Sequence, residues 1–405
     1  MTAQVAVMNK RAVALATDSA VTINGGSKIY DSANKLFMLS KKQPVGIMVY
    51  SNAEFLRVPW DIIIKGFRNY IESKKFDYLG DYKREFMEYI KSKSDEFELG
   101  KTFSVRNIYS MILEDIYVFL RSNYTERYTG AEDFNELIFN ILKEYDDIIK
   151  NERELYAGFD NLIGELTNYK QSLNQMITKR FGSLSKRNFN LIKQICRNSF
   201  KKDRYHNAIS TGVVIAGYGE KEIFPVLENI EISTMIGNSV VYKKNDKIAI
   251  NERSDSYVHA FAQKETVNTY LWGINDRYIN SFDGIIKETV IPLSNDIGKD
   301  MVERILANWQ KGIEKILADA RTDNIKPFMD AIRSLPKSEL GNLAESLVDL
   351  TSIKRRFTIN NLSNTVGGPI DVAIISKDDG FIWCKRKHYF EADLNHHFFK
   401  NYYEG

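Results

Sequence analysis

Near its beginning the chain reads Thr2-Ala-Gln-Val-Ala-Val-Met-Asn-Lys-Arg-Ala-Val-Ala-Leu-Ala-Thr-Asp18. Two runs rich in valine and alanine are separated by the polar residues Asn-Lys-Arg, a pattern typical of a β-hairpin. Because the second strand of a hairpin runs back along the first, its end returns beside the start of the first strand. The pattern therefore predicts that Asp18 lies close to Thr2.

The rest of the chain alternates between strand-like and helix-like segments. A second strand pair is predicted at 34–40 and 45–51, and Pro59 is a favourable residue for the first turn of the helix that follows. No proline occurs between Pro59 and Pro225, and apolar residues in this stretch recur every three or four positions, which predicts roughly five to seven helices. Later strands are predicted at 211–217, 224–233, 240–242, 247–251, 370–376 and 380–387, and later helices at 262–274, 338–354 and through most of 277–335.

This order of elements is strands, helices, strands, helices and strands. It lacks the strict alternation of strand and helix that builds parallel sheets, so we predict an α+β fold class with antiparallel sheets covered by helices. The helices predicted between roughly Pro59 and Phe200 form a helical subdomain. The apolar faces of these helices either bury against one another or bind another protein, and the sequence leaves both interpretations open.

The composition is that of an ordinary globular protein. The 405 residues are 43% hydrophobic and 27% charged, which excludes a mostly disordered or fibrous chain. No apolar run approaches the ~18 residues of a membrane span, and the net charge is only +3, so we predict no nucleic-acid partner and no membrane partner. The two cysteines, Cys196 and Cys384, cannot form a disulfide framework, which favours a cytoplasmic location. No spacing typical of a metal site occurs, and His396-His397 is interpreted as a surface pair.

The second residue of the chain brings a distinct chemistry. Methionine aminopeptidases generally remove Met1 when the next side chain is small, and the mature chain would then begin with Thr2. An N-terminal threonine carries a nucleophilic hydroxyl and, on the same residue, an α-amine of unperturbed pKa about 7.7–8.0 that can take the proton. This is the N-terminal threonine form of an activated nucleophile.

Such a nucleophile needs electrostatic partners. A cation near the hydroxyl stabilises the alkoxide, a carboxylate holds that cation, and backbone N–H groups stabilise the oxyanion that forms on the substrate. Asp18 ends the second predicted strand, and Lys35 opens the third. Ser51 and Asn52 lie where the fourth strand turns toward a helix, so their N–H groups are expected to point outward for an anion. The predicted catalytic residues are therefore Thr2, Asp18, Lys35, Ser51 and Asn52.

Several of these segments together resemble the proteasome β-subunits and HslV, a family of N-terminal nucleophile (Ntn) hydrolases. The similar segments are Thr2 with Val5-Ala-Val7, Ala14-Leu-Ala-Thr-Asp-Ser19, Ala33-Asn-Lys-Leu36, Val49-Tyr-Ser-Asn-Ala53 and Val366-Gly-Gly-Pro-Ile-Asp-Val-Ala-Ile-Ile-Ser-Lys-Asp-Asp-Gly380. The resemblance covers roughly residues 2–75, 208–290 and 337–390. It implies an αββα sandwich of two antiparallel sheets flanked by helices, in a bacterial proteasome-like branch with a large helical insertion. On this resemblance the core comprises residues 1–75 and 208–405, with additional helices at about 290–336, and residues 76–207 form the all-helical insertion.

The resemblance also implies an activity, the hydrolysis of peptide or amide bonds in a peptide or protein substrate without a cofactor. It implies a homo-oligomer as well, and leaves open an unfoldase or other regulatory partner. Where the family has an aspartate and a serine near the final hairpin, this chain has Ser363 and Val366, and either Ser254 or Ser256 is a candidate to orient the amine. These departures support an alternative, a non-catalytic scaffold or sensor whose helical insertion binds a partner. An amidase acting on a small molecule is a third hypothesis.

Overall fold

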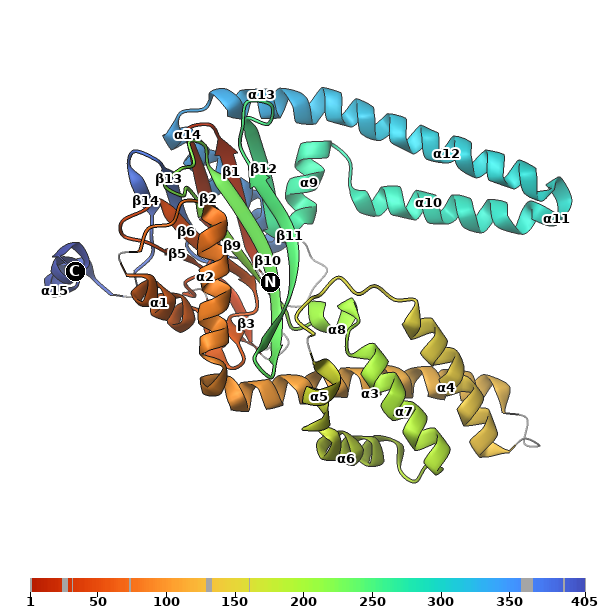
Figure 1. Ribbon diagram of the computed structural model, residues 1–405. Helices are drawn as coiled ribbons and strands as arrows, with labels where there is room; N and C mark the ends of the chain where they lie inside the picture. Colours follow the sequence, from red (N-terminus) through yellow and green to blue (C-terminus); the bar gives the residue numbers. More distant parts are fainter. Residues whose placement is uncertain are drawn as a thin grey trace.

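The computed structural model describes residues 2–23, 28–30, 32–72, 74–128, 133–159, 161–357, 367–388 and 390–404. Its centre is built from two five-stranded antiparallel sheets, and helices cover them and extend beyond them (Figure 1). The α+β fold class predicted from the order of elements is confirmed. Within the described ranges, no helix combines the length and the apolar character that crossing a membrane requires.

The first sheet contains both strands of the predicted N-terminal hairpin. Its strand order is β12, β1, β2, β13 and β14, with the bounds β1 Ala3–Asn9, β2 Ala12–Thr17, β12 Ser256–Ala262, β13 Asp371–Ser376 and β14 Gly380–Lys385. In the antiparallel pairing of β1 with β2, Gln4 lies opposite Thr17, so the end of β2 reaches the start of β1. Strand β12, which was not predicted, pairs with the other edge of β1 and places Ala262 opposite Ala3.

The second sheet has the strand order β11, β10, β9, β6 and β5. The bounds are β5 Leu36–Met38, β6 Val45–Ser51, β9 Thr211–Gly217, β10 Val226–Ile236 and β11 Ser239–Ala249. The strands predicted separately at 240–242 and 247–251 belong to one strand, β11, which ends at Ala249, two residues earlier than predicted. Its pairing with β10 continues across two irregularities in register. Two short strand pairs are also described, β3 (Val21–Ile23) with β4 (Lys28–Tyr30) and β7 (Glu54–Phe55) with β8 (Val58–Pro59).

Apolar side chains from the two sheets meet in one buried cluster. Successive residues of a strand point to opposite faces, so Leu15 of the first sheet reaches the same cluster as Met48 and Val214 of the second. All three are completely buried, and each contributes about 1.5–3 kcal/mol through removal from water. This shared core holds the sheets against each other, and with them the strand ends that carry the predicted catalytic residues.

Helices pack on the remaining face of each sheet. Helices α14 (Lys337–Phe357) and α9 (Lys264–Trp272) share an apolar cluster with the first sheet. Helices α1 (Trp60–Ile71) and α2 (Leu79–Ser92) share one with the second. Helix α1 begins directly after Pro59, as predicted, and α14 matches the helix predicted at 338–354.

The inserted helices have an apolar cluster of their own. It draws mainly on α3 to α8, and the bounds in this region are η2 Ser94–Phe97, α3 Glu98–Arg127, α4 Phe134–Lys150, α5 Leu162–Thr167, α6 Lys170–Phe181, α7 Lys186–Ser199 and α8 Asp203–Asn207. Their apolar stripes therefore bury against one another. Helix α2 lies inside the predicted insertion range 76–207, but its apolar residues pack with the second sheet. The helices that share the separate apolar cluster therefore begin with α3. The division into a core and an insertion otherwise remains a prediction.

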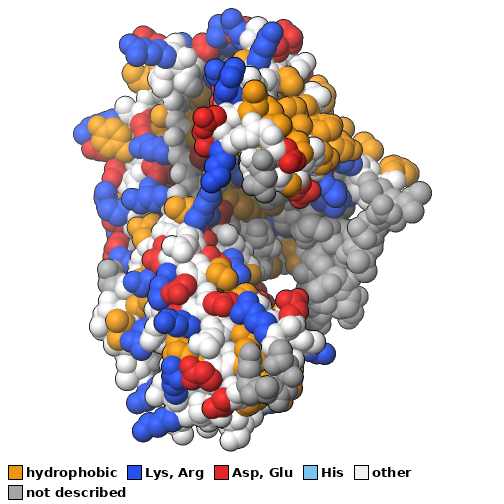
Figure 2. All heavy atoms as spheres, turned by 90° about the vertical axis from the view of Figure 1, so that its right-hand side faces the viewer, with side chains coloured by type: hydrophobic (Ala, Val, Ile, Leu, Met, Phe, Trp, Pro, Cys, Tyr) orange, Lys and Arg blue, Asp and Glu red, His pale blue; other side chains and the backbone are white. Residues whose placement is uncertain are grey.

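Helices α10 and α12 form a long arm that extends from the body on the same side as the inserted helices (Figure 1). The bounds are α10 Asp276–Val290, η3 Ile291–Leu293, α11 Ser294–Ile297, α12 Lys299–Ala320, η4 Arg321–Ile325 and α13 Lys326–Ser334. Figure 2 looks at the molecule from that side and shows hydrophobic side chains gathered in a patch in its upper half. The large apolar side chains that the arm exposes include Tyr278, Phe282, Ile285, Met301, Ile305 and Ile316. The last elements of the chain are η5 (Ala392–Leu394) and α15 (His396–Glu404).

Candidate active site

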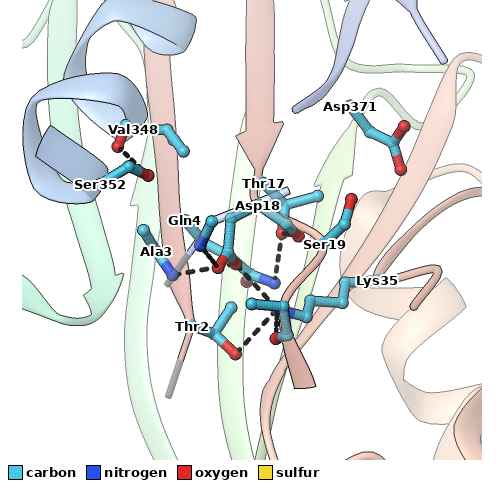
Figure 3. A network of polar contacts seen from close by, with 12 residues as sticks. Thr2, Ala3, Gln4, Thr17, Asp18, Ser19, Lys35, Val348, Ser352 and Asp371 are labelled. Carbon is cyan, nitrogen blue, oxygen red and sulfur yellow. Dashed lines mark hydrogen bonds and ion pairs between the residues drawn. The ribbon is translucent and has the colours of Figure 1, made fainter. Parts of the chain in front are cut away.

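The Lys35 ammonium is the centre of a polar cluster at the start of β1 (Figure 3). Its Nζ donates a hydrogen bond to Thr2 Oγ1 at 3.2 Å and forms an ion pair with Asp18 Oδ1 at 2.8 Å. It also donates to the Ala20 carbonyl at 2.6 Å. The Lys35 side chain is almost fully buried, so little solvent screens its charge and each of these interactions is stronger than it would be in water.

The Asp18 carboxylate holds Lys35 in this position. Asp18 follows β2, and the pairing of β2 with β1 continues through it, since the Asp18 N–H donates to the Ala3 carbonyl at 3.0 Å. The Ala3 N–H donates in return to Asp18 Oδ1 at 3.1 Å, and the Gly367 N–H donates to Oδ2 at 3.2 Å. Burial raises the pKa of the Asp18 carboxyl, while the Lys35 charge and these two N–H groups oppose the rise.

Thr2 is positioned by the two neighbours of β1. The residue after it, Ala3, lies opposite Ala262 of β12 on one side and bonds to Asp18 on the other, so the backbone next to Thr2 is held from both edges. The Thr2 side chain points toward Lys35 (Figure 3). Thr2 is 3% exposed, and its nitrogen is part of the peptide bond to Met1. A free amine therefore depends on removal of Met1.

Lys35 reaches Thr2 because the chain before β5 is tied to both sheets. The Ala33 N–H donates to the Ser19 carbonyl at 3.1 Å, one residue after Asp18. The Lys35 carbonyl accepts a hydrogen bond from the Val49 N–H of β6 at 2.9 Å. The residue that follows, Leu36, is buried in the cluster between the sheets. Lys35 thus lies at the junction of the two sheets, with its backbone fixed on either side.

Ser51 and Asn52 lie at the end of β6. Gln4 Nε2 donates to the Val49 carbonyl at 2.6 Å, which ties this end of β6 to β1. Ser51 has φ +76°, a conformation that glycine adopts freely and that costs other residues about 1–3 kcal/mol. Asn52 donates its side-chain amide to the Ser210 carbonyl at 2.9 Å. Neither residue hydrogen-bonds to Thr2 in the described part of the chain, and their role toward a substrate oxyanion remains a proposal.

The two serines expected to orient the amine lie elsewhere. Ser256 is opposite Asn9, at the far end of β1 and about 20 Å from Ala3 at ~3.4 Å per residue. Ser254 precedes Ser256 and lies outside that pairing altogether. Both candidates were wrong, because β12 was not predicted and it begins at the end of β1 that is opposite to Thr2.

The structure also adds groups that sequence reasoning missed. The Gly367 N–H and the Ala20 carbonyl complete the hydrogen bonds around Asp18 and Lys35. Gly367 belongs to the Gly-Gly segment noted before the final hairpin, but its contact with Asp18 spans nearly the whole chain and no local pattern could indicate it. The substituted positions Ser363 and Val366 lie outside the described residues.

The cluster can stabilise negative charge on Thr2 Oγ1. A buried ammonium within hydrogen-bond distance of a hydroxyl favours the ionised form of that hydroxyl, and a preorganised ammonium costs no reorganisation when the charge develops. Among the described residues, no group of three or more His, Cys, Asp or Glu side chains is placed to hold a metal ion. The chemistry that this cluster supports by itself is activation of an oxygen nucleophile.

Comparisons with known proteins give only weak likenesses. No protein-family model and no curated protein matches the chain. Among solved structures, a Gly-1 mutant of Anbu from Hyphomicrobium sp. strain MC1 is 9% identical, covering 100% of this chain and 96% of that chain with a TM-score of 0.30. Anbu (ancestral beta-subunit) from Yersinia bercovieri is 9% identical, covering 99% and 95% with a TM-score of 0.29. A helical assembly of the Anbu complex from Pseudomonas aeruginosa is 10% identical, covering 99% and 94% with a TM-score of 0.30. At these TM-scores the likeness carries no weight for this chain, and we base its assignment on its own geometry.

Proposed function

We propose that this chain is a threonine-type Ntn hydrolase, similar to the proteasome β-subunits and HslV, that cleaves peptide or amide bonds. The observation that carries the proposal is the hydrogen bond from Lys35 Nζ to Thr2 Oγ1 at 3.2 Å. Lys35 is at the same time ion-paired with the completely buried Asp18. A buried ion pair adds little to the free energy of unfolding, because removing both charges from water costs about as much as their attraction returns. A pair directed at the hydroxyl of the second residue does have a chemical use, because removal of Met1 frees a base on that same residue.

In the proposed mechanism the α-amine of Thr2 takes the proton of Oγ1, directly or through a water molecule. Before this transfer the Lys35 ammonium, as a nearby positive charge, keeps the amine neutral and able to take the proton, and after it the ammonium stabilises the resulting alkoxide. Oγ1 then forms a bond to the substrate carbonyl carbon, and the N–H groups of Ser51 and Asn52 donate hydrogen bonds to the carbonyl oxygen as negative charge develops on it. Asp18 takes no part in bond making and holds Lys35 in place.

The tetrahedral adduct then collapses to an ester. The carbon–nitrogen bond of the substrate breaks, the protonated amine of Thr2 gives its proton to the leaving nitrogen, and the acyl group stays on Oγ1. A water molecule, deprotonated by the same amine, attacks the ester carbon and releases the acid. The hydroxyl of Thr2 is regenerated, so the cycle consumes one water and one amide bond and needs no cofactor.

The fold proposal follows from the same residues. We propose that the two sheets, their shared core and the helices on their outer faces correspond to the αββα sandwich of the Ntn hydrolases. The core would comprise residues 1–75 and 208–405, and the insertion 76–207. The position of Thr2 at the start of β1, beside the end of β2, supports this correspondence.

We propose further that the chain forms a homo-oligomer and acts on peptides or proteins. Support for self-association comes from the α10–α12 arm, whose exposed apolar side chains would be covered by another copy. An unfoldase or regulatory partner is compatible with this assembly and is not identified by any feature of the chain. The cytoplasmic location also stays a proposal, consistent with two cysteines, Cys196 and Cys384, that are both free thiols.

The proposal is tested by labelling the purified full-length chain with a peptide epoxyketone, which forms a ring with a hydroxyl and the free amine of the same residue. Intact mass first shows whether Met1 has been removed. We expect one adduct per chain, mapped to Thr2, and none in Thr2→Ala. Thr125→Ala serves as the matched control, since Thr125 lies on α3 with its hydroxyl bonded to the Arg121 carbonyl. Labelling of Thr2→Ala at the wild-type rate would refute the assignment of the nucleophile.

One observation favours the second candidate, a non-catalytic scaffold or sensor. Thr2 is 3% exposed with Met1 attached, so an unprocessed chain offers neither a free amine nor access to the hydroxyl. Retention of Met1 in the chain purified from its natural source, together with the absence of labelling, would therefore support the scaffold. A chain that lacks Met1 and labels at Thr2 would exclude it.

A further inference from the structure

Helix α3 of the predicted insertion contacts the segment that follows the proposed oxyanion donors. Strand β6 ends at Ser51, and after Asn52 the chain enters the hairpin of β7 and β8. The backbone N–H of Trp60, the residue after this hairpin, donates to the Ala53 carbonyl at 3.1 Å. The hairpin is therefore hydrogen-bonded to the end of the turn that carries Ser51 and Asn52.

The hairpin is held in a conformation that its residues do not favour. Its two-residue loop consists of Leu56 and Arg57, with φ +51° and +68°. Loops of this kind normally contain asparagine, aspartate or glycine, because other residues are strained at positive φ. Among the described residues, six non-glycine residues have positive φ, and three of them, Ser51 included, lie between 51 and 57. Such strain persists only where the surrounding structure enforces it.

Two aromatic contacts fasten the hairpin to the start of α3. The Phe97 ring, at the residue before α3, packs edge to face against the Phe55 ring of β7, with centroids 5.8 Å apart. The Arg57 guanidinium lies over the Phe103 ring, 5.3 Å from its centroid. Because residues three apart lie on the same face of a helix, Phe97 and Phe103 define a face whose middle position is residue 100.

Gly100 brings the backbone of that face directly against the hairpin. A Cβ added at Gly100 would lie 2.0 Å from the Leu56 carbonyl oxygen, so any larger residue would force the hairpin and the helix apart. Glycine is unfavourable inside a helix. The close approach to Leu56 is the physical reason for a glycine at this position.

A second support of the turn comes from the start of β9, soon after the inserted helices. Asn52 donates its side-chain amide to the Ser210 carbonyl at 2.9 Å, and its own carbonyl accepts a hydrogen bond from the Thr211 hydroxyl at 3.4 Å. The Trp60 indole N–H donates to the same Thr211 oxygen at 3.0 Å. Thr211 is buried, and it links the residue after the hairpin to Asn52.

We propose that the start of α3, together with Thr211, positions the turn that carries the oxyanion donors. Within the described part of the chain the Asn52 backbone N–H donates to no acceptor, so it is available to a substrate. A donor that is fixed in advance costs no reorganisation when charge develops. This role rests on the proposed hydrolase function, and Phe97, Gly100, Phe103 and Thr211 act in it as positioning residues.

The test measures how fast a peptide epoxyketone labels Thr2 of the full-length chain. The rate at saturating probe (kinact) reports the chemical step, the half-saturating concentration (KI) reports binding, and the final yield reports the fraction of correctly folded chains. Gly100→Ala displaces the hairpin, and Thr211→Val keeps the side-chain shape but removes the hydroxyl. Loss of one oxyanion donor typically lowers kcat about 10²–10³-fold. We therefore expect each variant to lower kinact about tenfold or more, with KI and yield changed less than about twofold.

Two controls separate positioning from loss of structure. Gly284→Ala is matched to Gly100→Ala, because Gly284 lies in helix α10 and an added Cβ meets nothing within 4 Å there. Thr211→Ser keeps the hydroxyl and should retain the wild-type kinact. A lower yield at an unchanged kinact in Gly100→Ala or Thr211→Val would mean that these residues serve only the fold, and would overturn the proposal.

The same experiment distinguishes this proposal from the hydrolase assignment. A wild-type chain that lacks Met1 and does not label at Thr2 would refute the hydrolase, and the role of the turn with it. Labelling of the wild type at Thr2, together with a wild-type kinact in either Gly100→Ala or Thr211→Val, would refute the positioning role alone.

Discussion

Replacing Lys35 by methionine tests the geometry at the centre of the proposed site. The substitution keeps most of the side-chain length and removes the charge, so Asp18 keeps the two backbone N–H groups of Ala3 and Gly367 and loses its ion pair. Because Asp18 is completely buried, the carboxylate cannot be compensated by water. Removing one partner of a buried ion pair costs about 3–5 kcal/mol in the free energy of unfolding.

The magnitude can be converted to a melting temperature. At about 2.1 cal/mol/K per residue, a chain of 405 residues has an unfolding entropy of about 0.85 kcal/mol/K if it unfolds in one transition. A loss of about 3–5 kcal/mol then lowers Tm by about 4–6 °C. Lys65→Met is the matched control, because the Lys65–Asp61 pair is exposed and 3.0 Å long and is expected to change stability by less than about 1 kcal/mol.

The pH dependence supplies a second, independent readout. Burial raises the pKa of Asp18, and Lys35 opposes that rise, so Lys35→Met raises the pKa further. A folded-state pKa above the unfolded value means that the folded state binds the extra proton more readily. Its stability is then greatest at low pH and falls as the pH rises through the raised pKa. The stability difference between Lys35→Met and wild type should therefore shrink between pH 7 and pH 5.

Urea denaturation at several pH values measures both effects. The double variant Asp18→Asn/Lys35→Met removes both charges of this pair and should be more stable at pH 7 than Lys35→Met alone, with little pH dependence of the difference from wild type. The site as described is wrong if Lys35→Met lowers the free energy of unfolding no more than Lys65→Met does, and if that loss is the same at every pH. Lys35 would then not be buried against Asp18.

Three further predictions use other parts of the molecule. Ser51→Gly should raise the free energy of unfolding by about 1 kcal/mol, because φ +76° suits glycine, whereas Ser92→Gly at the end of α2 should not raise it. The midpoints of urea denaturation of the two variants test this difference. Burial lowers the pKa of His206 to about 4, below the unfolded value of about 6.5. As the pH drops from 6.5 to 4, this histidine therefore lowers the free energy of unfolding by about 3 kcal/mol. His206→Gln should flatten that slope in pH-dependent denaturation, and an unchanged slope would contradict it. Phe282→Asp and Ile316→Asp on the α10–α12 arm should reduce the mass of the oligomer by sedimentation, and an unaltered mass would remove the arm from the interface.

The local part of the site could be predicted from the sequence. Thr2 and Asp18 belong to one hairpin, so the alternation of two short strands was enough to place them together. Lys35 follows Asp18 closely along the chain, and the short connection limits how far it can lie from the hairpin. The Thr2–Asp18 contact depends on a strand pair whose register is set by the turn between its strands. Lys35 precedes β5 of the other sheet, so its contact depends on how the two sheets pack.

The distant part of the site could not be predicted in the same way. Strand β12 pairs with β1 although more than half of the chain separates them. Its aromatic residues Tyr257, His259 and Phe261 alternate with smaller ones, a strand signal that was present in the sequence. The pattern could have revealed a strand but not its partner, because pairing across such a distance depends on the whole fold. The misplacement of Ser254 and Ser256 follows directly from this gap.

Asp18 connects the separate segments on which the proposed chemistry depends. Its carboxylate receives a hydrogen bond from Ala3, beside the nucleophile, and another from Gly367, at the entry to the final strand pair, and it holds Lys35 by an ion pair. The Gly367 N–H makes this contact next to the pairing of β13 with β2, in which Asp371 lies opposite Thr17. The carboxylate that holds the charge beside Thr2 is thus positioned by segments from both ends of the chain, which meet in one sheet.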